Sequence, residues 1–439
     1  MTNSAADDLP VSTGPRPGRW APAWVIAFVA LWPAPGVAEG VLVLGALFAC
    51  VRLLQLRLRG GASLLSGPAW ALTTVLFLAY WLPQLVSAFD AVDAGRAWSK
   101  TAAGLRYLPF LWLAAIAVAT PERRRTTFGG LAVVVAVWTL DALAQVAGGS
   151  SPLFWSMDQL KWAMAGHGLC TAEQLAVVDR LSGVFGPCNL KLGPVLASLS
   201  PFLLFAAGRR FGIAGWLLAA AAVGVVIVLA GSRASWITYA LVLLFSGWRL
   251  LGGKQLLVVM ALAVAGAVAV GLLSPQVRGR IERTTMALQG DAAGVDAALS
   301  GRGQIWSAAA CMVRGHPFNG VGARGFREAY PDCDPDPAQT VAWGVGPALH
   351  AHQIVLEILA ETGIAGLLLW LAGVALAWRA WRYATAAVRE QARPAMLALA
   401  VTVFPLNTHL AFYSTFWGGL TLLLAALYAG TLGSGDADP

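Results

Sequence analysis

Two arginines stand at the borders of apolar stretches, where a charge is costly unless it has a task. Arg233 follows Gly231 and Ser232 in a very short joint between two apolar runs, and Arg302 closes a long polar segment. A guanidinium offers a fork of donors that matches phosphate oxygens, so both arginines are candidates to bind an anionic, phosphate-bearing substrate. The alternative for Arg233 is an anchor at the membrane interface.

A histidine pair precedes a later apolar run in His350-Ala351-His352-Gln353, with Glu357 and Glu361 just beyond. Imidazole titrates near neutrality, which suits a general base. Histidines at i and i+2 point to different faces of a helix and lack the i, i+4 spacing of helical zinc sites. We therefore disfavour a metal, and His352, at the mouth of a predicted span, is a candidate general base from which His350 is expected to point away. A structural, hydrogen-bonding role is the alternative for His352.

Other charged residues are weaker candidates for binding a substrate or a metal. Arg180 and Lys191 are expected at the mouth of a predicted span, either as phosphate or glycan contacts or as plain loop salt bridges and interface anchors. The acidic run Asp332-Cys333-Asp334-Pro335-Asp336 is interrupted by proline, which favours a disulfide-bonded turn over a metal site. The chain has neither a Rossmann nor a Walker phosphate loop, so we expect no cofactor.

A third arginine cluster lies at the start of a mixed stretch that continues to Leu299. Its members are Arg278, Arg280 and Arg283. The stretch is compatible with an amphipathic helix on the outer leaflet. Contact with lipid head groups and a role in substrate entry remain equally open for this cluster.

The composition indicates the kind of fold that positions these residues. Of 439 residues, 58% are hydrophobic and only 12% are charged, against about 25% charged in soluble domains. This excludes a soluble enzyme, a disordered protein and a nucleic-acid binder, despite the net charge of +8. We predict an all-α, polytopic membrane protein forming a single membrane domain over 1–439, with about twelve spans of roughly 20 residues. The predicted spans are 20–34, 36–54, 66–86, 105–120, 127–147, 192–208, 212–231, 234–250, 255–273, 353–378, 394–411 and 417–432.

Arginine and lysine in alternate joints predict the orientation by the positive-inside rule. The clusters are Arg52, Arg57 and Arg59; Arg123, Arg124 and Arg125; Arg209 and Arg210; Arg249 and Lys254; and Arg379, Arg382, Arg389 and Arg393. Both termini are then cytoplasmic, and 148–191 and 274–352 form outer loops. A cleaved signal peptide ending near Gly36-Val37-Ala38 is an alternative at the N-terminus that leaves later spans unchanged.

The cysteines agree with these loops. Cys170 and Cys188 share the first outer loop, and Cys311 and Cys333 share the second. Two pairs on the non-cytoplasmic side predict two disulfides in an oxidising compartment, with free thiols or a zinc site as weaker alternatives. Cys50 lies within a predicted span and is expected to be packed.

The histidine motif resembles a known family. His352-Gln353, nine residues and then Gly363-x-x-Gly366 fits the signature of bacterial O-antigen ligases. Gly231-Ser232-Arg233 and the run Arg302, Trp306, His316-Pro317 and Gly320-x-Gly322 are similar to the wider O-antigen ligase/polymerase family. The resemblance implies a GT-C-like membrane fold with a large periplasmic loop between helices 9 and 10 and part of the active site on that loop.

The resemblance also implies an activity. Such ligases transfer a whole O-antigen glycan from undecaprenyl pyrophosphate to lipid A–core at the periplasmic face of the inner membrane, without a metal and with inversion. It implies that His352 is the base, that Arg233 and Arg302 stabilise the pyrophosphate, and that Gln353 beside the base contacts substrate. The alternatives are O-antigen polymerase, protein O-oligosaccharyltransferase and, outside the enzymes, a lipid-linked oligosaccharide flippase. Few charges within the spans argue against the flippase.

Overall fold

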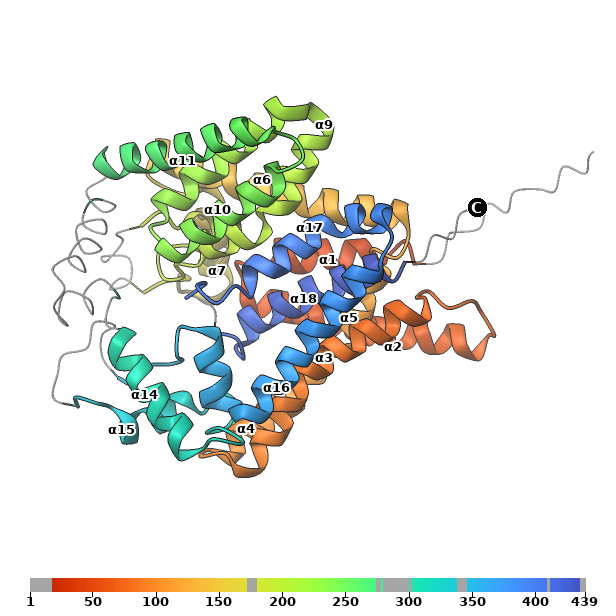
Figure 1. The fold of residues 1–439 in the computed structure, drawn as a ribbon, viewed down its shortest axis with the longest axis vertical. Helices are drawn as coiled ribbons and strands as arrows, with labels where there is room; N and C mark the ends of the chain where they lie inside the picture. The colour runs from red at the N-terminus through yellow and green to blue at the C-terminus, as the bar shows by residue number, and fades with distance from the viewer. Residues whose placement is uncertain are drawn as a thin grey trace, which may run out of the picture.

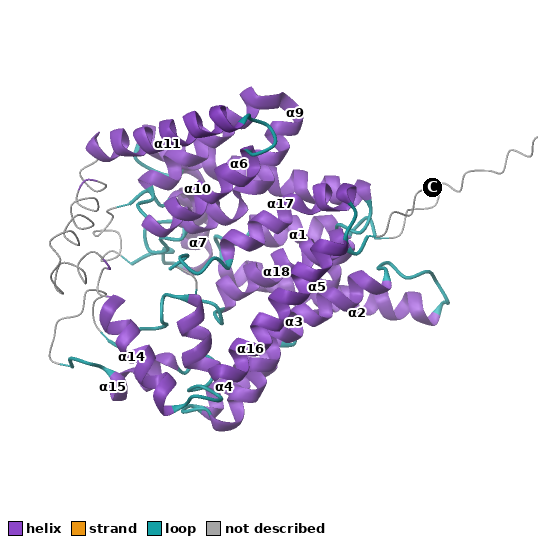
Figure 2. Ribbon diagram, in the orientation of Figure 1, coloured by secondary structure: helices purple, strands orange, loops and turns teal. Residues whose placement is uncertain are grey.

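The computed structural model is all-helical in the parts of the chain that it describes, which are 18–171, 180–273, 302–337, 346–408 and 411–434 with positions 278 and 299. Helices fill most of these ranges, and no strand occurs in them (Figure 1, Figure 2). The longer helices are α1 (Ala21–Ala30), α2 (Pro35–Leu58), α3 (Gly67–Ser87), α4 (Ala94–Gly104), α5 (Tyr107–Ile116), α6 (Pro121–Gly148), α7 (Pro152–Ala165), α9 (Leu192–Leu229), α10 (Arg233–Gly247), α11 (Gly253–Leu273), α14 (Arg302–Gly315), α15 (Phe326–Cys333), α16 (Ile354–Tyr383), α17 (Ala386–Thr402) and α18 (Thr415–Leu432).

Local sequence explains where several helices begin. The Ser66 hydroxyl accepts the backbone N–H of Ala69 at 3.2 Å, and the Ser151 hydroxyl accepts that of Phe154 at 3.0 Å. Each bond satisfies one of the N–H groups that a first turn leaves without an intrahelical partner. Proline occupies the first turn of α2, α3, α6 and α7, where its missing N–H costs no intrahelical bond.

Seven helices in the described ranges are long and apolar enough to cross a membrane: α2, α3 with its 3-10 extension to Asp90, α6, α9, α11, α16 and α18. The chain is therefore a multi-pass, all-helical membrane protein, but the predicted number of about twelve spans is wrong. Four predicted spans form helices of only 10, 10, 15 and 17 residues, namely α1, α5, α10 and α17. Two more are joined in α9, because hydropathy marks apolar residues and not the length of a helix.

The joined helix α9 folds back on itself. Its 38 residues would measure about 57 Å if straight, far more than a hydrocarbon core of about 30 Å. Gly212 interrupts it with a φ of 65° and a ψ of −153°. A Cβ on Gly193 would lie 3.1 Å from the Cβ of Ala230, so the two outermost turns are neighbours. The halves of α9 are thus antiparallel, with Arg209 and Arg210 at the tip.

Helix α18 forms the centre of the bundle. Every residue from Trp417 to Thr431 is buried, and α3, α5 and α17 pack around it. Small residues permit this close packing, as is usual between membrane helices. A Cβ on Gly430 would lie 2.6 Å from the backbone of Ala115, so α5 and α18 touch through their backbones. At the periphery, α11 packs mainly against α9 and α10 (Figure 1).

Helix ends that carry the predicted cytoplasmic arginines meet at one end of the bundle. Arg249 Nη1 donates to Glu390 Oε2 at 2.6 Å, which joins the end of α10 to α17. Arg124 Nη1 donates to Ser434 Oγ at 3.1 Å, which joins the start of α6 to the residues after α18. The opposite end of α10 begins at Arg233, about 21 Å away along the helix axis.

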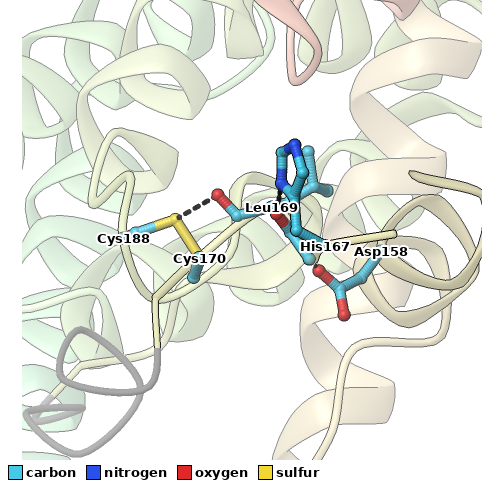
Figure 3. Close-up of a disulfide and its surroundings, with 6 residues drawn as sticks. Asp158, His167, Leu169, Cys170 and Cys188 are labelled. Carbon is cyan, nitrogen blue, oxygen red and sulfur yellow. Dashed lines mark hydrogen bonds between the residues drawn. A yellow bond between two sulfur atoms is a disulfide. The ribbon is translucent and has the colours of Figure 1, made fainter. Parts of the chain in front are cut away.

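Both predicted disulfides are confirmed. Cys170–Cys188 closes a loop of 18 residues, and the backbone N–H of Leu169 beside it donates to Asp158 Oδ1 at 2.6 Å, which ties the loop to α7 (Figure 3). Cys311–Cys333 joins α14 to α15. The expectation that Cys50 is packed is wrong, because this thiol is exposed on the outer face of α2.

The Cys311–Cys333 bond supports a small second core, in which Ile305 and Ala308 of α14 pack with Phe326 of α15. Replacing both cysteines by serine should lower the free energy of unfolding by about 3 kcal/mol, because the bond restricts the unfolded chain. The melting temperature of the purified protein would show this loss. Cys50→Ser is the control and should melt like the wild type, whereas unchanged melting of the double variant would contradict the prediction.

Candidate active site

Arg233 is the first residue of α10, and its neighbours explain its position. Gly231 has a φ of 68°, which turns the chain sharply between α9 and α10. The Ser232 hydroxyl then caps α10 by accepting the backbone N–H of Ser235 at 3.3 Å, and the Ser235 hydroxyl lies 2.7 Å from it. In the motif Gly231-Ser232-Arg233, the glycine therefore makes the turn and the serine caps α10. The arginine places a half-buried guanidinium at this end of the bundle.

Three arginines from different parts of the chain gather here. Arg302 is the first residue of α14, and its pKa is lowered mainly by burial and then by the positive charges of Arg233 and Arg180. These two charges act on Arg302 because Arg233 and Arg180 lie on the same side of the bundle within electrostatic range of it. Positive charge concentrated around Arg302 in this way suits a polyanion such as a diphosphate.

His352 lies beside this arginine group. Its pKa is lowered to about 4, first by burial and then by the charge of Arg302, against a weaker opposing effect of the Thr408 carbonyl. The ring Nδ1 lies 3.2 Å from that carbonyl oxygen. A carbonyl only accepts, so this contact selects the tautomer with the proton on Nδ1 and leaves Nε2 with its lone pair. His352 is thus a neutral imidazole with Nε2 available.

The backbone at His352 is unusual, with a φ of 53° in a non-glycine residue. This left-handed turn brings the two imidazoles together, with ring centroids of His350 and His352 3.9 Å apart. The expectation that His350 points elsewhere is wrong, because it assumed a helix where the chain turns. Trp306 of α14 holds the same turn by donating from Nε1 to the Ala351 carbonyl at 3.1 Å.

Lys191 and Gln353 lie at helix starts near the same end. Lys191 precedes α9, and its Nζ lies 4.0 Å from the centroid of the Phe416 ring. Burial lowers the pKa of this ammonium. Gln353 caps α16, because its Oε1 accepts the backbone N–H of Leu356 at 2.6 Å. The carbonyl half of its amide therefore already has a structural partner, and its contact with substrate stays a prediction.

Gly363 breaks α16 nine residues after the start, with a φ of 65° and a ψ of −167°. The break frees backbone groups that the segment 317–322 satisfies. The N–H groups of Val321 and Gly322 donate to the carbonyls of residues 360 and 361, and the N–H groups of residues 364 and 365 donate to the carbonyls of 317 and 318. The four distances are 2.8 to 3.2 Å. The motif glycine thus docks the outer segment onto α16.

A side chain at position 363 has no room. A Cβ there would lie 2.1 Å from the carbonyl oxygen of Phe318, and the backbone conformation is essentially restricted to glycine. Gly363→Ala should therefore destabilise the protein by roughly 3 kcal/mol or more. Gly129→Ala in α6 is the matched control, since nothing lies within 4 Å of its Cβ. Equal melting temperatures for the two variants would contradict this account.

Two buried carboxylates hold the outer segments in place. Glu361 Oε2 accepts the backbone N–H of Arg324 at 2.7 Å, and Glu357 Oε1 accepts that of Tyr413 at 3.3 Å. Both side chains are fully buried. In the sequence they follow just beyond the histidines and have no predicted role, because nothing in the local pattern indicates that they bind backbone far away in the chain. Thr408, which orients His352, was missed for the same reason.

The remaining predicted residues are less informative. Arg280 and Arg283 lie outside the described residues, and Arg278 is exposed. Within the described ranges, no group of three or more His, Cys, Asp or Glu side chains is arranged to hold a metal ion.

Fold and site together define a multi-pass membrane protein with a cationic group and a neutral histidine at one end of its bundle. The O-antigen ligase family model matches residues 216–371, which include Arg233, Arg302, His352 and Gly363. This match covers about a third of the chain and agrees with the resemblance seen in the sequence. Arg180 and Lys191 lie before the matched segment. No curated protein matches the chain.

Proposed function

We propose that this chain is a lipopolysaccharide O-antigen ligase. It transfers an O-antigen glycan en bloc from undecaprenyl pyrophosphate to lipid A–core at the periplasmic face of the inner membrane. The observation that carries the proposal is the proximity of Arg302 both to the arginines 180 and 233 and to His352. An anion-binding group thus adjoins a neutral nitrogen base, within the segment that matches the O-antigen ligase family.

The arginines stabilise the leaving group. Breaking the bond between the anomeric carbon and the phosphate oxygen leaves both electrons on undecaprenyl pyrophosphate, whose negative charge therefore grows in the transition state. Guanidinium groups fixed at that position stabilise the growing charge and need no metal. Arg233 and Arg302 take this role, and Arg180 and Lys191 add positive charge for the diphosphate or the glycan.

His352 activates the acceptor as its general base. A sugar hydroxyl is a poor nucleophile until its proton is removed, and Nε2 is free to take that proton. The hydroxyl oxygen then forms the new bond to the anomeric carbon as the diphosphate leaves from the opposite face. Attack of this kind inverts the anomeric centre. Gln353 follows the base directly and offers its amide nitrogen to substrate.

A reconstituted assay tests the proposal. Purified protein is mixed with undecaprenyl-pyrophosphate glycan and with lipid A–core, and the products are separated by size. Transfer of glycan to lipid A–core is expected. Extension of the donor glycan would indicate a polymerase, transfer to an added acceptor protein would indicate a protein O-oligosaccharyltransferase, and no transfer combined with movement of the donor across vesicles would indicate a flippase.

The proposed orientation has its own test. In a Cys50→Ser background, Arg125→Cys should react only with a membrane-permeant thiol reagent in intact cells, whereas Gln159→Cys in α7 should react with an impermeant one. Both side chains are exposed. The reason is the positive-inside rule applied to the joint before α6. Labelling of position 125 from outside would reverse the orientation.

A further inference from the structure

A cavity of about 360 Å³ lies at the end of the bundle opposite to His352. Three helices that pack against one another form it: the hairpin tip of α9, the end of α10 and the first half of α17 (Figure 1). Its lining comprises Phe205, Gly208, Arg209, Ser246, Arg249, Leu250, Glu390, Gln391 and Arg393. The proposed transfer reaction uses none of these residues.

The charges around this cavity do not balance. Three arginines face a single carboxylate, so three positive charges minus one negative leave an excess of two. Glu390 is engaged by Arg249 at 2.6 Å and by Arg393 at 3.2 Å. Arg209 has no carboxylate within ion-pair distance in the described part of the chain. The three guanidinium groups come from α9, from the turn after α10 and from α17, and they converge, which simple membrane anchors do not need to do.

Apolar and aromatic groups lie in this cavity and at the end of α10 that borders it. The Arg393 guanidinium lies 5.3 Å from the centroid of the Phe205 ring, and its Nη2 donates to the Phe245 carbonyl at 3.1 Å. Phe245 itself is 50% exposed and Trp248 is 64% exposed. Exposed aromatic rings at a helix end are typical of the interface between lipid head groups and acyl chains.

We propose that this cavity binds the phosphate head group of an anionic phospholipid. Arginine forks match the phosphate oxygens, and the excess positive charge matches a phosphodiester that has an acidic or neutral head group. Phe205, Leu250 and the exposed rings give the acyl chains an apolar surface. This surface favours a lipid over free inorganic phosphate, although both carry the same chemical group.

Native mass spectrometry of the full chain in detergent tests the proposal with dioleoyl phosphatidylglycerol, dioleoyl phosphatidylcholine and inorganic phosphate as probes. Phosphatidylglycerol should bind at least roughly tenfold more tightly than phosphatidylcholine, because the excess positive charge of the cavity repels the choline cation that phosphatidylcholine carries beside its phosphate. Arg209→Gln should weaken phosphatidylglycerol binding roughly tenfold, because a neutral amide replaces a charge-assisted hydrogen bond to the phosphate. Glu390→Gln should tighten it, because the charge excess rises from two to three.

Arg210→Gln is the matched control, because Arg210 is the exposed neighbour at the same hairpin tip and does not line the cavity. It should bind phosphatidylglycerol like the wild type. Equal weakening by Arg209→Gln and Arg210→Gln, or equal binding of the two lipids, would overturn the proposal. Saturable binding of inorganic phosphate without preference for phosphatidylglycerol would overturn the lipid as the source of the phosphate. If Arg209→Gln fails to fold, the affinity of Glu390→Gln for phosphatidylglycerol tests the proposal, and unchanged or weaker binding would overturn it.

Discussion

His352→Ala is expected to fold and to bind the lipid-linked donor, yet to transfer glycan about 10²–10⁴-fold more slowly. Donor affinity comes mainly from burial of the lipid and from the arginines, whereas only the acceptor step needs a proton acceptor. The same preparation should be measured for melting temperature, donor binding and single-turnover transfer. A purely structural histidine predicts the reverse, with lower stability and unchanged turnover in the protein that folds.

The control for this variant is His167→Ala. His350 is unsuitable, because its ring packs against that of His352. His167 is exposed after α7, and its Nδ1 lies 3.1 Å from the neighbouring Gly168 carbonyl oxygen (Figure 3). Its removal should leave transfer intact. Normal turnover in well-folded His352→Ala would remove this histidine from the mechanism and make Glu357 or Glu361 the next base to test.

The pH dependence follows from the low pKa of His352, which lies at about 4. Only the neutral ring accepts a proton, so kcat/KM for the donor should stay level from pH 8 to about 5 and fall at lower pH. The donor brings negative charge to Arg302 and so opposes one cause of the low pKa. The acid limb of kcat should therefore lie at higher pH than that of kcat/KM. An acid limb of kcat/KM whose midpoint lies near the usual pKa of histidine, about 6.5, would contradict this prediction.

Arg302→Lys should lower the rate of transfer by about 10²–10³-fold although it preserves the charge. An ammonium lacks the planar fork and cannot hold two phosphate oxygens in the same way. Arg233→Lys should behave alike, and the two losses should not add, because both groups act on one diphosphate. Initial rates at limiting donor are the measurement.

Arg314→Lys provides the comparison, since Arg314 is exposed at the other end of α14, about 18 Å from Arg302 along the helix axis. It should transfer glycan at the wild-type rate. A near wild-type rate for Arg302→Lys would mean that this arginine only anchors α14. The same outcome for Arg233→Lys would return it to the role of an interface anchor.

Much of the site was predictable because its residues are rare where they occur. Arg233, in a joint of a few residues, had to lie at a helix end, and Arg302 and His352 were singled out by the family motif. The disulfides were predictable because each outer loop holds two cysteines. What the sequence leaves open is the pairing of distant segments, such as Thr408 with His352 and Glu361 with Arg324.

The errors have identifiable physical causes. Hydropathy located each apolar run but did not reveal that α5 contains only 10 residues or that α9 turns at Gly212. The position of His350 was wrong because a left-handed residue at 352 reverses the local direction of the chain. Cys50 was expected inside the protein because apolar sequence does not distinguish a helix face that meets protein from one that meets lipid.

The four backbone bonds between 317–322 and 360–365 also have a consequence for protein engineering. They fix the spatial register of two segments whose bonded residues are 39 to 47 positions apart in sequence. A deletion of one residue within 317–322 would therefore shift every bond of this register at once, and an engineered variant should leave the length of that segment unchanged.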